Sequence, residues 1–135
     1  VAEVSLDANN RPIVHKVTCA IDCGWTVNPD TAKAQVESGI IFGLTAALYG
    51  EITIENGQVA QNNFPDYEMV RLADSPEIDV HIVESGEALG GLGEPATPPI
   101  AAAVANGLYI LTGQRVRELP LKNHDFSRSS PLAQV

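Results

Sequence analysis

A single glutamate, Glu94, lies in the part of the sequence best suited to hold a reactive side chain. It follows the glycines Gly90, Gly91 and Gly93, and Pro95 comes directly after it. Glycine lets a backbone pass close to a ligand, whereas proline fixes its own φ and restricts the preceding residue to extended conformations. The sequence therefore predicts a stiff, narrow turn that presents one carboxylate. Taken alone, the pattern slightly favours an ordinary exposed glutamate, because glycine and proline are common in surface loops.

The rest of the sequence offers this carboxylate no obvious catalytic partner. A lone carboxylate can act as a general base, but it needs a group to act on. The sequence contains no phosphate-binding or dinucleotide-binding glycine motif and no HExxH motif. Ser38 lacks the surroundings of a nucleophile elbow. The histidines have no spacing typical of metal ligands, so we expect none from this chain. A cofactor, if there is one, must contact mainly backbone and small side chains.

The two cysteines, Cys19 and Cys23, are expected to be free thiols. If both lie on one strand, a spacing of four residues puts them on the same face but about 13 Å apart. That separation is too large for a disulfide. Two cysteines also cannot supply the four thiolates that an iron–sulfur cluster usually takes. We therefore expect buried or half-buried thiols.

The overall composition is that of one acidic domain. Its 135 residues are 44% hydrophobic but only 5% aromatic, so the core must be built from small and aliphatic side chains. The net charge of −9 argues against nucleic acid or an anionic membrane as a partner. No run approaches the roughly 20 apolar residues of a membrane span. Because the chain begins with Val1, we expect a processed product or an excised piece of a longer protein, and its localisation stays open.

Short strands are predicted around the candidate turn. Alternating apolar and polar residues indicate two hairpins and one further half-buried strand. The second hairpin has Asn56-Gly57 at its turn, the strongest short hairpin signal. The predicted strands cover residues 1–6, 13–21, 51–54, 58–60 and 77–83.

A first helix is predicted from Asn28, which can cap it, to a stop at Gly50. Gly39 and Gly43 lie one turn apart inside this helix, where each glycine costs about 1 kcal/mol relative to alanine. A face open to very close approach would offset that cost. Its partner is either another helix, which this feature alone favours, or a ligand.

A second helix is predicted directly behind Glu94, from Pro99 to about residue 111, with Thr97 as its cap. It is apolar nearly all round, so we expect it to be deeply buried. The fold class is then α+β: a mixed or antiparallel sheet of about five or six strands packed with two main helices. We expect one domain over residues 1–122 and a polar tail over residues 123–135.

Four motifs occur in an order that is specific, although each of them is weak alone. They are Asp22-Cys23-Gly24 with Asn28-Pro29, Gln35-Val36-Glu37-Ser38-Gly39 with Gly43-Leu44, Asn63-Phe64 with Tyr67, and Gly93-Glu94-Pro95 with Pro98-Pro99. This order resembles the C-terminal part of the molybdenum-binding subunit of the xanthine dehydrogenase/aldehyde oxidase family. The bacterial branch around isoquinoline 1-oxidoreductase and molybdopterin-binding aldehyde dehydrogenases is most similar. The resemblance covers about residues 1–121.

The resemblance changes the interpretation of Glu94. It implies that Glu94 faces molybdenum and acts as a base, taking a proton from a hydroxyl ligand that attacks an electrophilic carbon of the substrate. It also implies that Gln35 reaches the pterin, since an amide can both donate and accept hydrogen bonds. The other cofactor-binding residues that it implies are Gly39, Gly91, Leu92 and Gly93. In several relatives a proline stands where this chain has Val70, so the resemblance does not imply a particular substrate.

The resemblance implies a fragment of an oxidoreductase. The cofactor would be molybdenum-molybdopterin, with the cytosine dinucleotide form as one option, and this chain should not hold it alone because the family's subunits are several times longer. A partner subunit would carry a [2Fe-2S] cluster. The substrate would be an aldehyde or an N-heterocycle, hydroxylated with oxygen derived from water. The alternative is a non-catalytic interaction or scaffold domain of the same fold.

Overall fold

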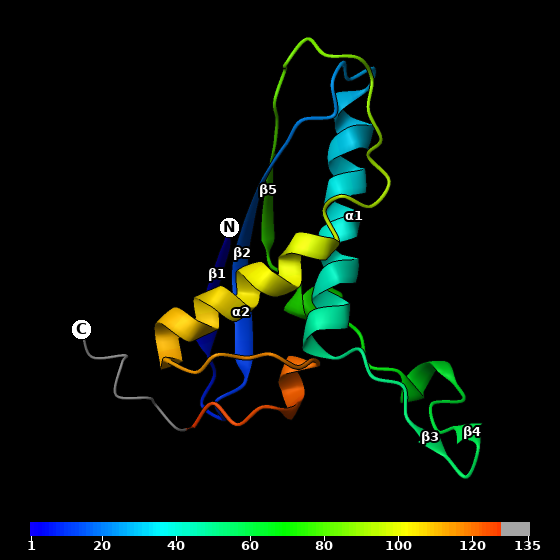
Figure 1. Cartoon of the computed structure of the whole chain (residues 1–135), viewed down its shortest axis with the longest axis vertical. Coiled ribbons are helices and arrows are strands. Elements are labelled where there is room, and N and C mark those ends of the chain that lie inside the picture. The colour runs from blue at the N-terminus through cyan, green and yellow to red at the C-terminus, as the bar shows by residue number, and fades with distance from the viewer. Residues whose placement is uncertain (128–135) are drawn as a thin grey trace.

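The computed structural model describes residues 1–127, in which short strands alternate with two long helices. The predicted α+β class is confirmed (Figure 1). The elements, in chain order, are β1 (Ala2–Leu6), β2 (Pro12–Ile21), α1 (Pro29–Leu48), β3 (Ile54–Glu55), β4 (Gln58–Val59), β5 (Glu77–Ile82) and α2 (Pro98–Thr112), with 3₁₀ turns η1 (Phe64–Asp66), η2 (Leu72–Asp74) and η3 (Leu121–Asn123). None of the described helices is both long and apolar enough to cross a membrane.

The five strands form two sheets rather than one. The larger sheet has the order β1-β2-β5, with β1 antiparallel and β5 parallel to β2. The pairing of β1 with β2 shifts by one residue, so that His15 has no partner of its own and forms a bulge. The bulge lets both Val14 and Val17 point into the core although they are three residues apart. Strands β3 and β4 form a separate hairpin, as Asn56-Gly57 predicts.

Helix α1 begins and ends where the sequence predicts. The Asn28 side chain accepts a hydrogen bond from the Thr31 backbone N at 3.1 Å, which caps the first turn. One side of the helix is buried, with Val36, Ile40 and Leu44 at most 1% exposed. Helix α1 packs against β5 and α2, while α2 crosses in front of β1 and β2 (Figure 1).

Helix α2 differs from the prediction. Only one stripe at helical spacing is buried, namely Ile100, Val104, Leu108 and Thr112. Ile110 is 80% exposed and Leu111 is 45% exposed, so the prediction of burial nearly all round was wrong. The reason is that β1 and α1, the elements that make the most contacts with this helix, lie on the side of its buried stripe.

The face of α1 that carries Gly39 and Gly43 packs against α2 and the two residues just before it. A Cβ added to Gly43 would lie 2.2 Å from Ile100 Cγ2, and one added to Gly39 would lie 3.2 Å from Ala96 Cβ. Both glycines are buried at this crossing. Helix packing, the first of the two alternatives, therefore explains them. The space that the missing Cβ of Gly39 opens is occupied by Ala96 and Thr97. The expectation that Gly39 contacts a cofactor stays a prediction.

Packed structure continues beyond residue 122. Phe126 is only 3% exposed and belongs to the same apolar core as Leu121. The boundary predicted at residue 123 therefore falls inside the packed chain, since a single aromatic side chain ties this segment to the core. The remainder of the predicted tail, 128–135, lies outside the described residues.

Candidate functional site

The Glu94 turn belongs to a long loop, residues 83–97, that connects β5 to α2. Figure 1 shows this loop passing over the start of α1 and then running down beside it. Gly24 has φ +69°, and a Cβ there would lie 2.1 Å from the carbonyl O of Ala88. The Gly90 N donates to the carbonyl of Cys23 at 2.9 Å. Backbone contacts with residues 23–25 therefore fix the first half of the loop.

Asp22 joins the two segments with its side chain. Its Oδ1 accepts hydrogen bonds from the Gly24 N at 2.9 Å and from the Ser85 Oγ at 2.8 Å. These two donors, the backbone one foremost, hold the pKa of the Asp22 carboxyl below its usual value. The first of the four sequence motifs thus shapes the loop that carries the last one.

Helix α1 holds the second half of the loop at two points. The Gln35 Nε2 donates to the carbonyl of Gly93 at 2.6 Å, and the Thr97 Oγ1 donates to the carbonyl of Gly39 at 3.0 Å. The sequence predicts that Thr97 caps α2, but its side chain makes no capping hydrogen bond. The Thr97 side chain instead ties the start of α2 to α1. The two contacts are four residues apart on the helix and four apart in the loop, and Glu94 lies between them.

Glu94 sits on the narrow turn that its neighbours predict. Its carbonyl accepts a hydrogen bond from the Thr97 N at 2.9 Å, which closes the turn just before α2. The carboxylate is exposed and forms no hydrogen bond or ion pair with the rest of the described chain. Its two carboxylate oxygens are therefore free to accept hydrogen bonds from a ligand.

A cavity of about 400 Å³ lies between the start of α1 and the loop. Among the predicted site residues, Gln35, Leu92 and Gly93 line it, whereas Gly91 and Glu94 flank it in the loop. Its lining carries no Asp, Glu, Lys or Arg and includes Cys23, Trp25, Thr26, Val27, Asn28, Thr31, Ala32, Leu89 and Gly90. A Cβ added to Gly91 or Gly93 would meet nothing within 4 Å, so the backbone on this side is open.

The sequence did not indicate the apolar rim of this cavity. Trp25, Val27 and Leu89 are 67–71% exposed at its edge. The available signal was the only tryptophan of the chain, standing directly after the Cys23-Gly24 pair. Cys23 itself is buried and Cys19 is half-buried; both are free, as expected. No group of three His, Cys, Asp or Glu suited to a metal ion occurs within residues 1–127.

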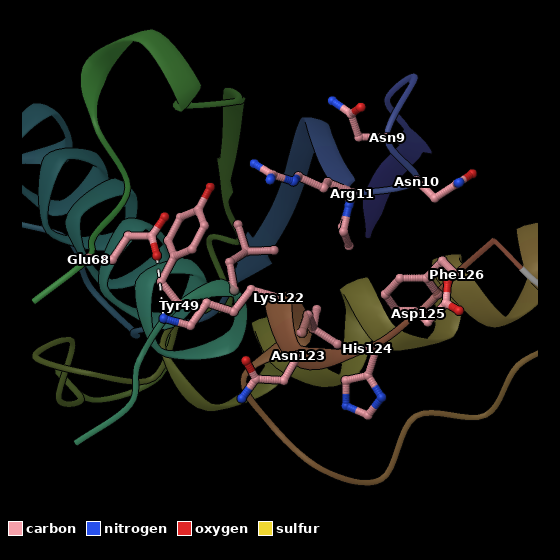
Figure 2. Close-up of a pocket in the computed structure, with 13 residues that line it drawn as sticks. Asn9, Asn10, Arg11, Tyr49, Glu68, Lys122, Asn123, His124, Asp125 and Phe126 are labelled. Atoms are coloured by element: carbon pink, nitrogen blue, oxygen red, sulfur yellow. Dashed lines mark hydrogen bonds and ion pairs between the residues drawn. The ribbon is translucent and has the colours of Figure 1, made fainter. Parts of the chain in front are cut away.

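A second cavity, of about 540 Å³, lies at the other end of α1 (Figure 2). Arg11, Tyr49, Lys122 and His124 surround it, and none of the predicted site residues does. Burial raises the pKa of the Tyr49 hydroxyl, with smaller contributions from nearby carboxylates, so Tyr49 is neutral at physiological pH. Its place at the far end of the helix separates this cavity from the Glu94 turn.

Residues 1–76 match the model of the molybdopterin cofactor-binding domain family. The chain belongs to this family. It is 37% identical, over 98% of its length, to the beta subunit of isoquinoline 1-oxidoreductase from Brevundimonas diminuta. It is 35% identical, over 80% of its length, to a putative molybdenum-binding subunit of xanthine dehydrogenase from Escherichia coli. The resemblance seen in the four motifs is therefore confirmed.

Solved structures support the same family. The aldehyde oxidoreductase from Desulfovibrio desulfuricans superposes with a TM-score of 0.75 at 26% identity, over 89% of this chain and 14% of that one. The Cu,Mo-dependent CO dehydrogenase shares the fold, with a TM-score of 0.75 at 18% identity over 87% of this chain and 16% of that one. The chain spans about 17% of the isoquinoline 1-oxidoreductase subunit and 15% of the xanthine dehydrogenase subunit. It thus corresponds to one part of these longer proteins.

Proposed function

We propose that this chain is the C-terminal part of the catalytic subunit of a molybdenum hydroxylase, with Glu94 as its base. One observation carries the proposal. Gln35 and Gly93, which are 58 residues apart and belong to different motifs, meet in a hydrogen bond of 2.6 Å directly beside Glu94. This contact, next to a cavity with an uncharged lining, supports a single site formed by the two motifs.

The residues around the cavity fit a pterin cofactor. A pterin is a flat, polar ring system, and backbone and side-chain amide groups can donate hydrogen bonds to it and accept them from it. Gly91 and Gly93 leave that space free, and the Gln35 Oε1 has no hydrogen-bond partner among the described residues. We propose that Gln35, Gly91, Leu92 and Gly93 form one wall of the cofactor site. When bound, the molybdenum cofactor supplies the redox centre that accepts two electrons from the substrate.

Glu94 would act as the general base that accepts a proton during the reaction. Its carboxylate is exposed, unpaired and fixed on a turn, so it can accept a proton from the water-derived nucleophile without first breaking an ion pair. The substrate would be an aldehyde or an N-heterocycle. Electrons would leave through a [2Fe-2S] cluster on a partner subunit, and the cytosine dinucleotide form of the pterin is one option. The remainder of the molybdenum subunit would complete the site.

Glu94→Gln in the complete protein tests this role. The amide keeps the shape of the side chain but cannot take the proton, so we expect turnover to fall by about 10²–10⁴-fold while the molybdenum and pterin contents stay unchanged. Glu87→Gln is the matched control, because it removes another exposed carboxylate from the same loop. Normal turnover by Glu94→Gln would refute the assignment.

The second candidate is a non-catalytic scaffold domain of the same fold. The large apolar side chains exposed on α2, such as Ile110, favour a surface that binds other protein. The two candidates differ in composition, because a scaffold has no need of the cofactor. Molybdenum and pterin measured in the natively purified complex distinguish them, and a complex that contains neither favours the scaffold.

A further inference from the structure

Residues 51–69 form a protruding segment that we call the arm. It leaves the end of α1 after Gly50 and returns at Val70, and none of its residues is buried. Figure 1 shows the β3–β4 hairpin and η1 standing apart from the sheet and the two long helices. The conformation of the arm therefore does not depend on the apolar core.

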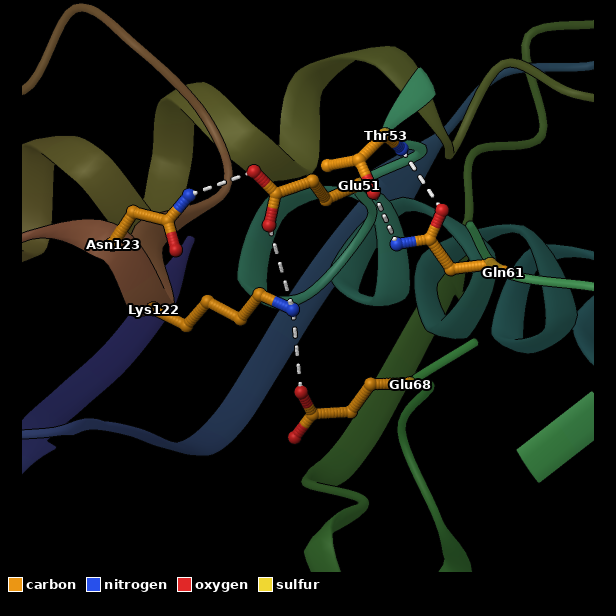
Figure 3. Close-up of polar contacts among 6 residues, drawn as sticks. All are labelled: Glu51, Thr53, Gln61, Glu68, Lys122 and Asn123. Carbon is orange, nitrogen blue, oxygen red and sulfur yellow. Dashed lines mark hydrogen bonds and ion pairs between the residues drawn. The ribbon is translucent and has the colours of Figure 1, made fainter. Parts of the chain in front are cut away.

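Polar contacts hold the arm at its root (Figure 3). The Lys122 Nζ lies 3.8 Å from Glu51 Oε2 and 3.4 Å from Glu68 Oε2, so one lysine joins both ends of the arm to the C-terminal segment. Asn123 Nδ2 also donates to Glu51 Oε1 at 3.2 Å. Together these contacts fix the direction in which the arm leaves the domain.

A second pair of contacts closes the arm above its root. The Thr53 N donates to Gln61 Oε1 at 2.8 Å, and the Gln61 Nε2 donates to Thr53 Oγ1 at 2.9 Å. The backbone adds a bond of 2.9 Å from the Ala60 N to the Thr53 carbonyl. Further out, the Asn63 side chain and Asp66 form a capping box around η1. These hydrogen bonds join residues of the arm to one another rather than to the sheet or the two long helices.

The arm carries large apolar side chains that the described chain leaves uncovered. Ile54 is 72% exposed and Val59 is 47% exposed; they are cross-strand partners and so lie on the same face of the hairpin. Phe64 is 95% exposed. Two strands of two residues each are too short to be stable alone in water. Such an apolar face typically marks a surface that another protein segment covers.

The arm is acidic, and its charge indicates what residues a surface that covers it must carry. Its sequence has four carboxylates and no Lys, Arg or His. The carboxylate of Asp66, in the same 3₁₀ turn as Phe64, makes no ion pair with a described residue. A complementary surface is therefore apolar at its centre and basic at its rim.

We propose that the arm docks onto the part of the molybdenum subunit that lies outside these 135 residues. This inference rests on the proposed function, and it names the arm as the element that contacts the remainder of the subunit. The chain spans about 17% of the subunit to which it is 37% identical, so most of such a protein remains to supply the covering surface. The occupant is an apolar surface with basic residues around it.

Photo-cross-linking in the complete protein tests the proposal. A benzophenone amino acid is placed at Ile54, at Phe64 and, as the matched control, at Glu55. Glu55 is next to Ile54 in β3, so its side chain points to the opposite face of the same hairpin. We expect Ile54 and Phe64 to give cross-links to molybdenum-subunit peptides outside residues 1–135, and Glu55 to give at least several-fold fewer.

Cross-links to a second copy of this chain, to an iron–sulfur subunit or to nothing would overturn the proposal. Ile54→Asp provides an independent measurement, because it puts a charge on the docking face without touching the root of the arm. We expect it to speed amide hydrogen exchange over residues 52–69 of the complete protein by about tenfold or more, whereas Glu55→Asp leaves it unchanged. Molybdenum and pterin assays report separately on the proposed function, so the two ideas can fail independently.

Discussion

At the scale of single residues, two side chains organise the candidate site without being its reactive group. Gln35 ties Gly93 to α1, and Asp22 ties Ser85 to the turn before the same helix. Gln35 binds the backbone of the loop that carries Glu94, and Asp22 binds the hydroxyl of Ser85 in the same loop. The position of the carboxylate therefore depends on ordinary hydrogen bonds, each of which contributes about 1 kcal/mol in a folded protein.

Gln35→Leu is expected to loosen the Glu94 turn. Leucine has a similar size but cannot donate to the Gly93 carbonyl, so the loop loses the hydrogen bond that ties Gly93 to α1. The amides of Gly90 and Thr97, which donate to the carbonyls of Cys23 and Glu94, should exchange faster by up to about tenfold, while the helix itself exchanges as before. Ser38→Ala, at another exposed position of the helix, is the control. Unchanged exchange in the Gln35→Leu protein would show that this contact does not hold the loop.

The contact between Asp22 and Ser85 is expected to depend on pH. The folded-state pKa of Asp22 lies below its usual value of 3.8, so this carboxylate contributes stability above that value. The contribution is lost as the pH falls through the folded pKa and the carboxylate becomes protonated. Side-chain NMR of Asp22 and the amide signals of residues 85–87 should titrate together below the usual value. Asp22→Asn should abolish the titration of those amide signals; if it persists, another group is responsible.

At the scale of elements, the crossing of α1 and α2 sets the place where the loop ends. Thr97 and Ala96 lie at this crossing, directly after Glu94, and they pack on the glycines of α1. A bulkier residue would push the start of α2 away and would carry the Glu94 turn with it. The small residues at this crossing therefore affect the position of Glu94 indirectly, because they set the distance between α1 and α2.

Gly43→Ala tests the crossing. The new Cβ would lie 2.2 Å from Ile100 Cγ2 and 2.7 Å from the Thr97 carbonyl, so we expect a loss of about 1–3 kcal/mol in the free energy of unfolding. Gly39→Ala is the matched comparison, because its Cβ would meet Ala96 at 3.2 Å and alanine favours the helix. Urea denaturation should show a clearly smaller loss for Gly39→Ala. Equal losses would contradict this account of the crossing.

At the scale of the whole molecule, the chain has one continuous apolar core, but it also exposes large apolar side chains on its surface. The core runs from the sheet through both helices to Phe126. In contrast, the arm, the outer side of α2 and the rim of the 400 Å³ cavity expose large apolar side chains. This distribution agrees with a chain that spans about 17% of a related subunit.

Two phenylalanines distinguish the core from this surface. Phe126→Ala should lower the free energy of unfolding by about 3–5 kcal/mol, because the side chain is 3% exposed. Phe64→Ala makes the same chemical change on the arm, where the side chain is 95% exposed, and should change the free energy by about 0.5 kcal/mol at most. Chemical denaturation of the two variants measures the difference. A small effect of Phe126→Ala would instead support the predicted end of the domain at residue 122, because Phe126 would then contribute little to the core.

The sequence by itself determined the local elements of this protein. The Asn28 cap, the Asn56-Gly57 turn and the alternating strands act over a few residues, so short patterns are sufficient to predict them. The motif order also determined the family. These are the features for which the physical cause and the sequence signal lie in the same short stretch.

Only the tertiary structure decided which distant groups meet. It separated β3 and β4 from the main sheet, left one side of α2 exposed, and placed Ile100 of α2 in the space beside Gly43. It also joined Gln35 to Gly93 across 58 residues. Burial and long-range hydrogen bonds depend on how whole elements pack, and no local pattern encodes that packing.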